Sequence, residues 1–229
     1  MTRRLAILAV TALLMWGVKR HYADAPADDL RWMLTPTSRL VSLATGVPFE
    51  WQSREGYFSR ERMFLIAKAC AGINFMIAAF GMTVFLLAAR ATTAASAGRI
   101  VIVSAAVSYA AAILVNAARI SFALWLAAHP GAVTWLSAAQ LHRAAGIACY
   151  FGGLLILYQS IRRSERATLA VPLAWYYAIA IVVPLLNGAR GWASVRHMIV
   201  VFTLPLAFVG TIVVIERAAR HVRSLAART

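Results

Sequence analysis

The sequence predicts an all-α integral membrane protein with about six transmembrane helices. One segment at the outer face is expected to hold a short amphipathic helix and a small hairpin. Hydrophobic residues make up 62% of the 229 residues, whereas soluble domains are about 45–50% apolar. These residues lie in long runs, and the mean hydropathy is +0.72. Most arginines lie in short pieces between the runs. Membrane proteins carry such residues in the loops between their spans, where they set the orientation of the chain.

The charge and the cysteines exclude several classes of protein. A formal charge of +15 arises from 23 Lys and Arg against 8 Asp and Glu. Such basicity is compatible with nucleic-acid binding, but the arginines flank apolar runs, so we expect no nucleic-acid partner. Cys70 and Cys149 both lie in apolar runs and do not form a disulfide framework. No cluster of His, Cys, Asp and Glu has the spacing of metal ligands, so we expect no metal and no cofactor.

Six apolar runs define the expected spans, and we treat the chain 1–229 as a single multi-pass membrane domain. A span needs about 20 apolar residues. The first run is shorter and also resembles a signal peptide, with Ala23-Asp24-Ala25 as a candidate cleavage site, so an anchor and a cleaved signal both stay open. The expected spans are 5–18, 64–89, 100–127, 144–161, 169–186 and 198–215.

Residues 19–62 form the one substantial segment outside the membrane, and they hold six of the eight acidic residues. Apolar residues at helical spacing predict an amphipathic helix over Thr37–Val47 that lies on the bilayer surface. Pro36 is expected just before this helix, and Gly46 at its end. Aromatic residues on both sides of a polar turn predict a small hairpin over Phe49–Phe58. The apolar face of the expected helix consists of Leu40, Leu43 and Val47.

The charge of the loops predicts that both termini lie in the cytoplasm. With six spans and an internal N-terminus, the inner pieces hold eleven arginines against Glu165 and Glu216, and the short outer loops hold three arginines. This asymmetry follows the positive-inside rule. The inner arginines are Arg3, Arg4, Arg90, Arg99, Arg162, Arg163, Arg166, Arg217, Arg220, Arg223 and Arg228.

Three chemically active side chains reach one level near the outer face in this topology. Cys70 lies six residues into a helix that enters from outside, about 9 Å below the outer boundary. Arg119 lies eight residues before the end of a helix that exits outside, about 12 Å deep by the same rise. His142 lies in the outer loop, just before the fourth span. Lys68 is near enough to the surface to snorkel, and we assign it no role.

These three residues suit cysteine acyl transfer. A thiol needs a nearby cation or base to become a thiolate. Arg119 keeps its charge and can stabilise a thiolate or an oxyanion. His142 titrates near neutrality and can transfer a proton. The pattern therefore predicts a cysteine nucleophile at Cys70, whereas Cys149 has no polar companion one turn away and is interpreted as a packing residue.

Three further residues are expected to support this set. Gly72 would let a substrate backbone approach closely, and Asn74 and Asn116 lie one helical turn from Cys70 and Arg119 on the same faces. Structural alternatives exist: membrane cysteines commonly serve in packing, a histidine at a helix start is commonly an interface residue, and Asn116 can hydrogen-bond between helices. Arg119 is harder to explain by structure alone, because an arginine at that depth costs about 2.5–3.5 kcal/mol.

Three motifs in this order resemble those of the exosortase/archaeosortase family. They are a Cys-small-Gly segment, an Asn-x-x-Arg segment and a His-x-x-x-Gly segment, and the resemblance covers roughly residues 36–158. The amino-acid sequence around the cysteine, Ala-Lys-Ala-Cys-Ala-Gly-Ile-Asn-Phe, is most similar to that of the exosortase K branch. In this chain the motifs are Ala69-Cys70-Ala71-Gly72-Ile73-Asn74, Asn116-Ala117-Ala118-Arg119-Ile120 and His142-Arg143-Ala144-Ala145-Gly146.

The resemblance implies a membrane cysteine protease-transpeptidase of the bacterial cytoplasmic membrane. Cys70 would be the nucleophile, Arg119 the anion stabiliser and His142 the third catalytic residue. The archaeal branch uses an arginine in the third place, so Arg143 is an alternative there. Many members carry serine after the cysteine, and this chain has Ala71. The substrates would be exported proteins with a C-terminal motif, one membrane helix and a basic cluster.

Two other classes of function compete with this hypothesis. A small transporter or channel could use Arg119 and Asn116 to line a path for an anion, although transporters more often show internal repeats and polar groups at mid-membrane. A non-catalytic assembly subunit held by helix packing is the third class. The sequence leaves open the substrate, its recognition motif, the acceptor nucleophile, the choice between hydrolysis and transpeptidation, and the oligomeric state.

Overall fold

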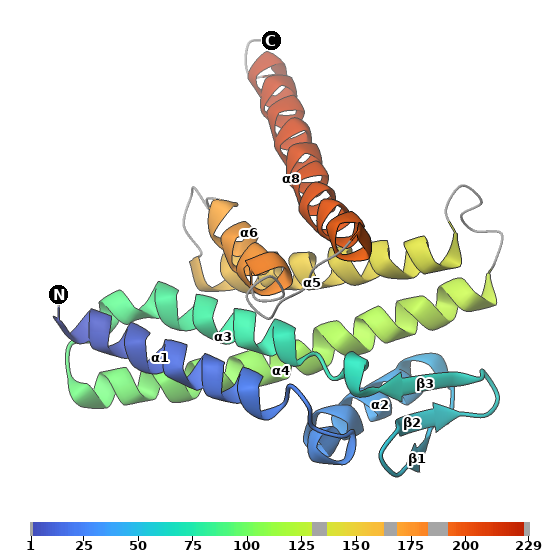
Figure 1. The fold of residues 1–229 in the computed structure, drawn as a ribbon. Helices are drawn as coiled ribbons and strands as arrows, with labels where there is room; N and C mark the ends of the chain where they lie inside the picture. The colour runs from blue at the N-terminus through green and yellow to red at the C-terminus, as the bar shows by residue number, and fades with distance from the viewer. Residues whose placement is uncertain (1, 130–136, 163–168, 183–191, 227–229) are drawn as a thin grey trace.

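A computed structural model describes residues 2–129, 137–162, 169–182 and 192–226 as helices with one small sheet (Figure 1). The long helices are α1 (Thr2–His21), α3 (Ile73–Leu87), α4 (Ala94–Ala128), α5 (Ala138–Arg162) and α8 (Trp192–Ala226). The shorter elements are η1 (Asp28–Leu30), α2 (Arg31–Thr45), β1 (Glu50–Gln52), β2 (Gly56–Ser59), β3 (Phe64–Ala67), η2 (Lys68–Cys70), η3 (Ala88–Arg90), α6 (Ala170–Tyr177) and the π-helical turn η4 (Ala178–Val182).

The helices pack into a bundle with the sheet at one end. Helices α1, α3 and α4 lie side by side, and α5 packs against α3 and α4 (Figure 1). Helix α8 contacts α5 and α6 near its start and then extends away from the other helices. Helix α2 and the sheet lie where α1 ends and α3 begins. Large buried side chains from α3, α4 and α5 form the core, among them Met82, Ile120, Phe151 and Leu154.

Within the described ranges, three helical segments are long and apolar enough to cross a membrane. They are Lys68–Arg90, Ala94–Ala128 and Arg143–Arg162, and two shorter apolar helices follow at Ala170–Val182 and Met198–Thr211. The six expected spans are therefore not confirmed. Helix α1 covers the first expected run, but only fourteen apolar residues separate the basic residues at its two ends, which is short for a span.

The prediction that a helix starts at Phe64 is wrong. Residues Phe64–Ala67 form β3, which pairs antiparallel with β2 so that Ile66 lies opposite Tyr57. Helix α3 begins only at Ile73. Periodicity cannot distinguish a strand from a helix in a short apolar run, and here pairing with β2 decides. Cys70 therefore lies in the turn η2, so its depth cannot be calculated from a helical rise.

The predicted hairpin is confirmed, because β1 and β2 pair antiparallel with Trp51 opposite Tyr57. For the helix expected after Pro36, the predicted end near Gly46 is confirmed and the predicted start is wrong. Helix α2 ends before Gly46, which has φ of +72°, but it starts at Arg31 and contains Pro36.

A hydroxyl from α4 explains why α2 tolerates the proline. Proline lacks the N–H that would bond the carbonyl four residues earlier, which here belongs to Trp32. The Tyr109 hydroxyl donates to that carbonyl at 3.0 Å. The buried face of α2 also differs from the expected one, since Met33, Leu34 and Val41 are fully buried whereas Leu43 is 83% exposed.

Helices α4 and α5 both begin earlier than expected, because each has a polar cap. The Thr93 and Ser96 side chains exchange hydrogen bonds with each other's backbone N–H groups at the start of α4. Ser137 and Gln140 make the same reciprocal pair at the start of α5, as in a capping box. Residues 142 and 143 therefore belong to a helix and not, as expected, to a loop. The expected end of α4 is confirmed, because the helix stops at Ala128.

The buried face of α2 can be tested by a matched pair of truncations. Met33→Ala removes a side chain with 0% exposure and should lower the free energy of unfolding by about 2–5 kcal/mol, because it leaves a cavity. Leu43→Ala should change it by less than about 0.5 kcal/mol. Urea unfolding in detergent micelles measures both. A loss at Leu43→Ala as large as that at Met33→Ala would contradict this burial pattern.

Candidate active site

Cys70 lies in a short turn that connects the sheet to α3. The 3-10 turn Lys68–Cys70 follows β3 directly, and the Ala71 N–H donates to the Lys68 carbonyl at 3.0 Å. Gly72 then takes φ of +74° as the chain enters α3. A residue with a Cβ would be strained by about 1–2 kcal/mol in this left-handed conformation. Such a Cβ would also lie 3.4 Å from Cγ of Asn116, so a glycine suits both the turn and the contact.

The buried amide of Asn116 joins three segments. Its Nδ2 donates to the carbonyl of Cys70, and its Oδ1 accepts from the Tyr150 hydroxyl at 3.1 Å. Asn116 is 0% exposed. This confirms the interpretation that Asn116 hydrogen-bonds between helices. The turn that carries Cys70 is thereby attached to α4, and α4 to α5.

Arg119 lies one turn beyond Asn116 on α4. Its guanidinium carbon lies 5.2 Å from the centre of the Tyr150 ring, which is within the range of a cation–π contact. Its Nε is buried and has no hydrogen-bond partner among the described residues. A Cβ on Gly146 would lie 3.7 Å from Nη1 of Arg119. The glycine of the third motif therefore lies against the arginine of the second.

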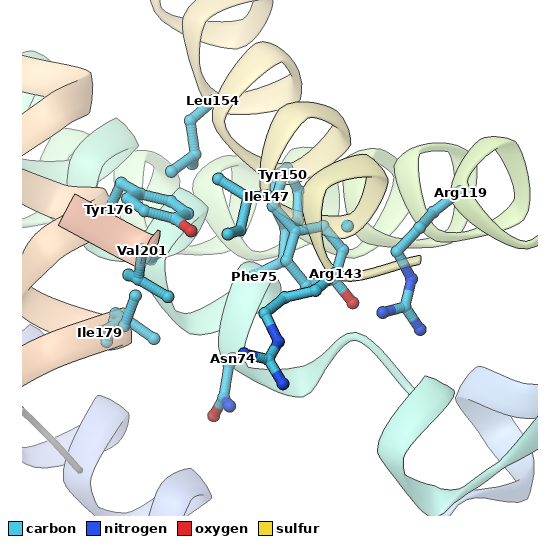
Figure 2. A pocket seen from close by; sticks show the side chains of 13 residues that line it. Asn74, Phe75, Arg119, Arg143, Ile147, Tyr150, Leu154, Tyr176, Ile179 and Val201 are labelled. Carbon is cyan, nitrogen blue, oxygen red and sulfur yellow. The ribbon is translucent and has the colours of Figure 1, made fainter. Parts of the chain in front are cut away.

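Two adjoining cavities open around these residues. The larger has a volume of about 500 Å³ and lies between α3, α5, α6, η4 and α8. Figure 2 shows its two parts: Asn74, Arg119 and Arg143 lie on one side, and apolar residues such as Leu154 and Val201 on the other. The smaller has a volume of about 230 Å³. Both share Asn74, Arg119 and Tyr150 in their walls.

Cys70 itself is not among the residues that line either cavity. It is half-buried and packs against the core, while its neighbours Ala69 and Gly72 line the smaller cavity. Asn116 joins the Cys70 carbonyl to the Tyr150 hydroxyl, and the Arg119 guanidinium lies over the Tyr150 ring. The segment that carries the thiol and the arginine therefore meet at one tyrosine.

The remaining expected site residues have different outcomes. Arg143 lines the larger cavity from α5. Asn74 does not share a helical face with Cys70, as was expected, because the helix begins after Cys70; its Oδ1 accepts from Lys19 Nζ at 2.7 Å. The backbone of His142 lies in α5, but its side chain lies outside the described residues. Its proposed role stays a prediction.

Two residues of this site were missed from the sequence. Tyr150 follows Gly146 by one helical turn on α5, so the period of 3.6 residues could have placed it on the motif face. Lys19 directly follows the first apolar run, and no local sequence pattern relates it to Asn74, 55 residues away. What distinguishes Tyr150 in the structure is the hydrogen bond from its hydroxyl to Asn116.

The role of Tyr150 in holding the Cys70 turn can be tested with Tyr150→Phe, which keeps the ring and removes the hydroxyl. We expect the free energy of unfolding to fall by about 1 kcal/mol. Alkylation of Cys70 by iodoacetamide, followed by mass spectrometry, should become several-fold faster because Asn116 loses a partner. Tyr109→Phe is the matched control, since it also removes one hydrogen bond to a carbonyl. A Cys70 alkylation rate equal in both variants would exclude this role.

Comparison with known proteins identifies the family. Residues 1–159 match the family model described as transmembrane exosortase, of the EpsH type. The match covers all three motifs and well over half of the chain, and it does not distinguish branches, so the likeness to exosortase K stays a prediction. No curated protein and no solved structure matches the chain. The chain belongs to the transmembrane exosortase family.

Proposed function

We propose that the protein cleaves exported proteins at a C-terminal sorting signal through an acyl-enzyme on Cys70. Family membership implies a transmembrane exosortase with sorting-signal proteins as substrates. The observation that carries the proposal is the Asn116 side chain, which joins the carbonyl of Cys70 to Tyr150, the residue that also contacts Arg119. These contacts attach the turn that carries Cys70 and the Arg119 side chain to the same tyrosine. A cation near a thiol favours the nucleophilic thiolate, which is the role proposed for Arg119.

The proposed reaction proceeds in two steps. The Cys70 thiol gives its proton to His142, and the sulfur attacks the scissile carbonyl carbon. Arg119, which lines both cavities, donates to the oxyanion that forms. His142 then returns the proton to the leaving amine. Arg143, the alternative third residue, keeps its proton and would stabilise negative charge instead. Water or an acceptor nucleophile attacks the thioester and releases Cys70.

The larger cavity supports binding of a substrate that is partly apolar. Its walls include Phe75, Ile147, Leu154 and Val201. Asn74, Arg119 and Arg143 lie together on one side, and the Tyr176 hydroxyl lies among the apolar residues of the other. A substrate with a membrane helix next to a polar motif has the same division. We propose that the motif lies at Arg119 and that the adjoining apolar residues enter the cavity.

The alternative function, an anion path lined by Arg119 and Asn116, has less support. Asn116 is fully buried, and both of its polar atoms are engaged with Cys70 and Tyr150. It lines neither cavity. A pore-lining side chain would need at least one free polar group towards the path.

Loss of the thiol should abolish processing. Cys70→Ala and Cys70→Ser are expected to leave a co-expressed candidate substrate at full length on immunoblots, because neither side chain supplies a thiolate. Hydroxylamine should release a substrate hydroxamate from the wild type and none from Cys70→Ala. The matched control is Cys149→Ala, which removes the other free cysteine and should process normally. Unchanged processing in both Cys70 variants would end the thiol hypothesis.

We also propose that 1–229 is one membrane domain with both termini in the cytoplasm and the site at the outer face. A membrane-impermeant maleimide added to intact cells should label Cys70 in the Cys149→Ala variant. It should not label Cys149 in the Cys70→Ala variant. Cys149 lies well inside α5, so in the proposed topology the membrane shields it from the reagent. A reporter fused within residues 90–99 should be cytoplasmic. An external position for that reporter would reverse the proposed orientation.

A further inference from the structure

The smaller cavity is lined by three cations from three elements. Lys19 lies at the end of α1, Lys68 in η2 and Arg119 on α4, and no Asp or Glu is among the lining residues. Within the described ranges, the ion pairs are Arg60 with Glu50 and Arg62 with Glu61. The three cations of the cavity therefore have no carboxylate partner in that part of the chain.

Each of these cations keeps hydrogen-bond donors free. Lys19 Nζ donates to Asn74 Oδ1 at 2.7 Å, and Lys68 Nζ donates to the Ala23 carbonyl at 2.9 Å. Both acceptors are neutral, and an ammonium group has three N–H donors. The Nε of Arg119 is buried without a partner among the described residues. Donors and charge are thus both in excess around this cavity.

An anion in the cavity would offset two unfavourable effects. Like charges from three segments repel one another when they line one space. Burial lowers the pKa of the Lys19 amine from its ordinary value, which shows that the surroundings disfavour its charge. The fold nevertheless keeps these side chains in place through specific hydrogen bonds to Asn74 and Ala23.

We propose that the smaller cavity is a binding site for a phosphate group. A phosphate presents several acceptor oxygens and carries about −1.5 to −2 charges as a monoester, which matches cations from three sides better than the two oxygens of one carboxylate. A carboxylate would be satisfied by one bidentate arginine. Arg119 and the two lysines can instead each take a different phosphate oxygen.

The larger cavity indicates what the phosphate can be attached to. The two cavities share Asn74, Arg119 and Tyr150, and the larger is mainly apolar beyond them. The site can therefore take a free phosphate group or one joined to an apolar chain. Ala69 and Gly72, on either side of Cys70 in the sequence, also line the phosphate cavity. Binding of a phosphate group at this site does not rest on the proposed function.

Binding can be measured with the purified full chain in detergent micelles by isothermal titration. The probes are inorganic phosphate, dioctanoyl phosphatidic acid, dioctanoylglycerol and a short blocked peptide with one glutamate. Lys19→Gln and Lys68→Gln should each weaken phosphate binding about tenfold, since each removes charge-assisted hydrogen bonds. Arg20→Gln is the matched control, because Arg20 adjoins Lys19 in α1 and lines neither cavity; it should change affinity less than about twofold.

Lys19→Arg keeps the charge and should retain affinity within about threefold of the wild type, which separates loss of charge from loss of folding. Tighter binding of phosphatidic acid than of inorganic phosphate, with no binding of dioctanoylglycerol, supports a lipid phosphate. Equal affinities support a free phosphate group. The inference fails if neither phosphate probe binds, if Arg20→Gln weakens binding as much as Lys19→Gln, or if the peptide binds more tightly than phosphate.

The outcome is independent of the thiol chemistry. Cys70→Ala should bind phosphate as the wild type does, because Cys70 is not in the cavity wall. Absence of phosphate binding together with loss of processing in Cys70→Ala would overturn the phosphate site and leave the proposed function standing. Phosphate binding with normal processing in Cys70→Ala would do the reverse.

Discussion

The candidate site depends on one buried amide. Asn116 has no exposed surface, and burying its amide without partners would be unfavourable by about 2 kcal/mol or more. The Cys70 carbonyl and the Tyr150 hydroxyl satisfy both of its polar atoms. Because the three groups belong to η2, α4 and α5, this requirement determines where the cysteine turn lies relative to both helices. Arg119, one turn away, is then placed over the Tyr150 ring.

Three cations from separate segments meet at one cavity. The end of α1, the turn before α3 and the middle of α4 meet at the smaller cavity, and each brings one cation. The apolar walls of the larger cavity adjoin this polar region through Asn74, Arg119 and Tyr150. An enzyme acting on a chain that leaves the membrane needs both environments in contact, since the substrate is polar at the cleaved bond and apolar beyond it.

Sequence reasoning located most of the secondary structure but not all of its boundaries. The hairpin, the stop of α2 at Gly46 and the stop of α4 at Ala128 follow from local turn and helix-breaking signals. The third strand was missed because Phe64–Ala67 is apolar and runs directly into the next apolar segment, so it resembled the start of that helix, whereas it pairs with β2 just before it. Pro36 was placed outside α2 because only the Tyr109 hydroxyl, 77 residues away, satisfies the carbonyl that the proline leaves free.

The sequence by itself determined the class of protein and the family motifs, because composition, charge distribution and motif order are local properties of the chain. It also indicated that Cys70, Arg119 and the 142–146 segment belong together, since alternating helix directions bring them to one end. The tertiary structure alone decided that Cys70 lies in a turn, that Tyr150 joins the site and that Lys19 and Lys68 line a cavity with Arg119. These features depend on hydrogen bonds and packing between residues far apart in sequence, for which no short pattern exists.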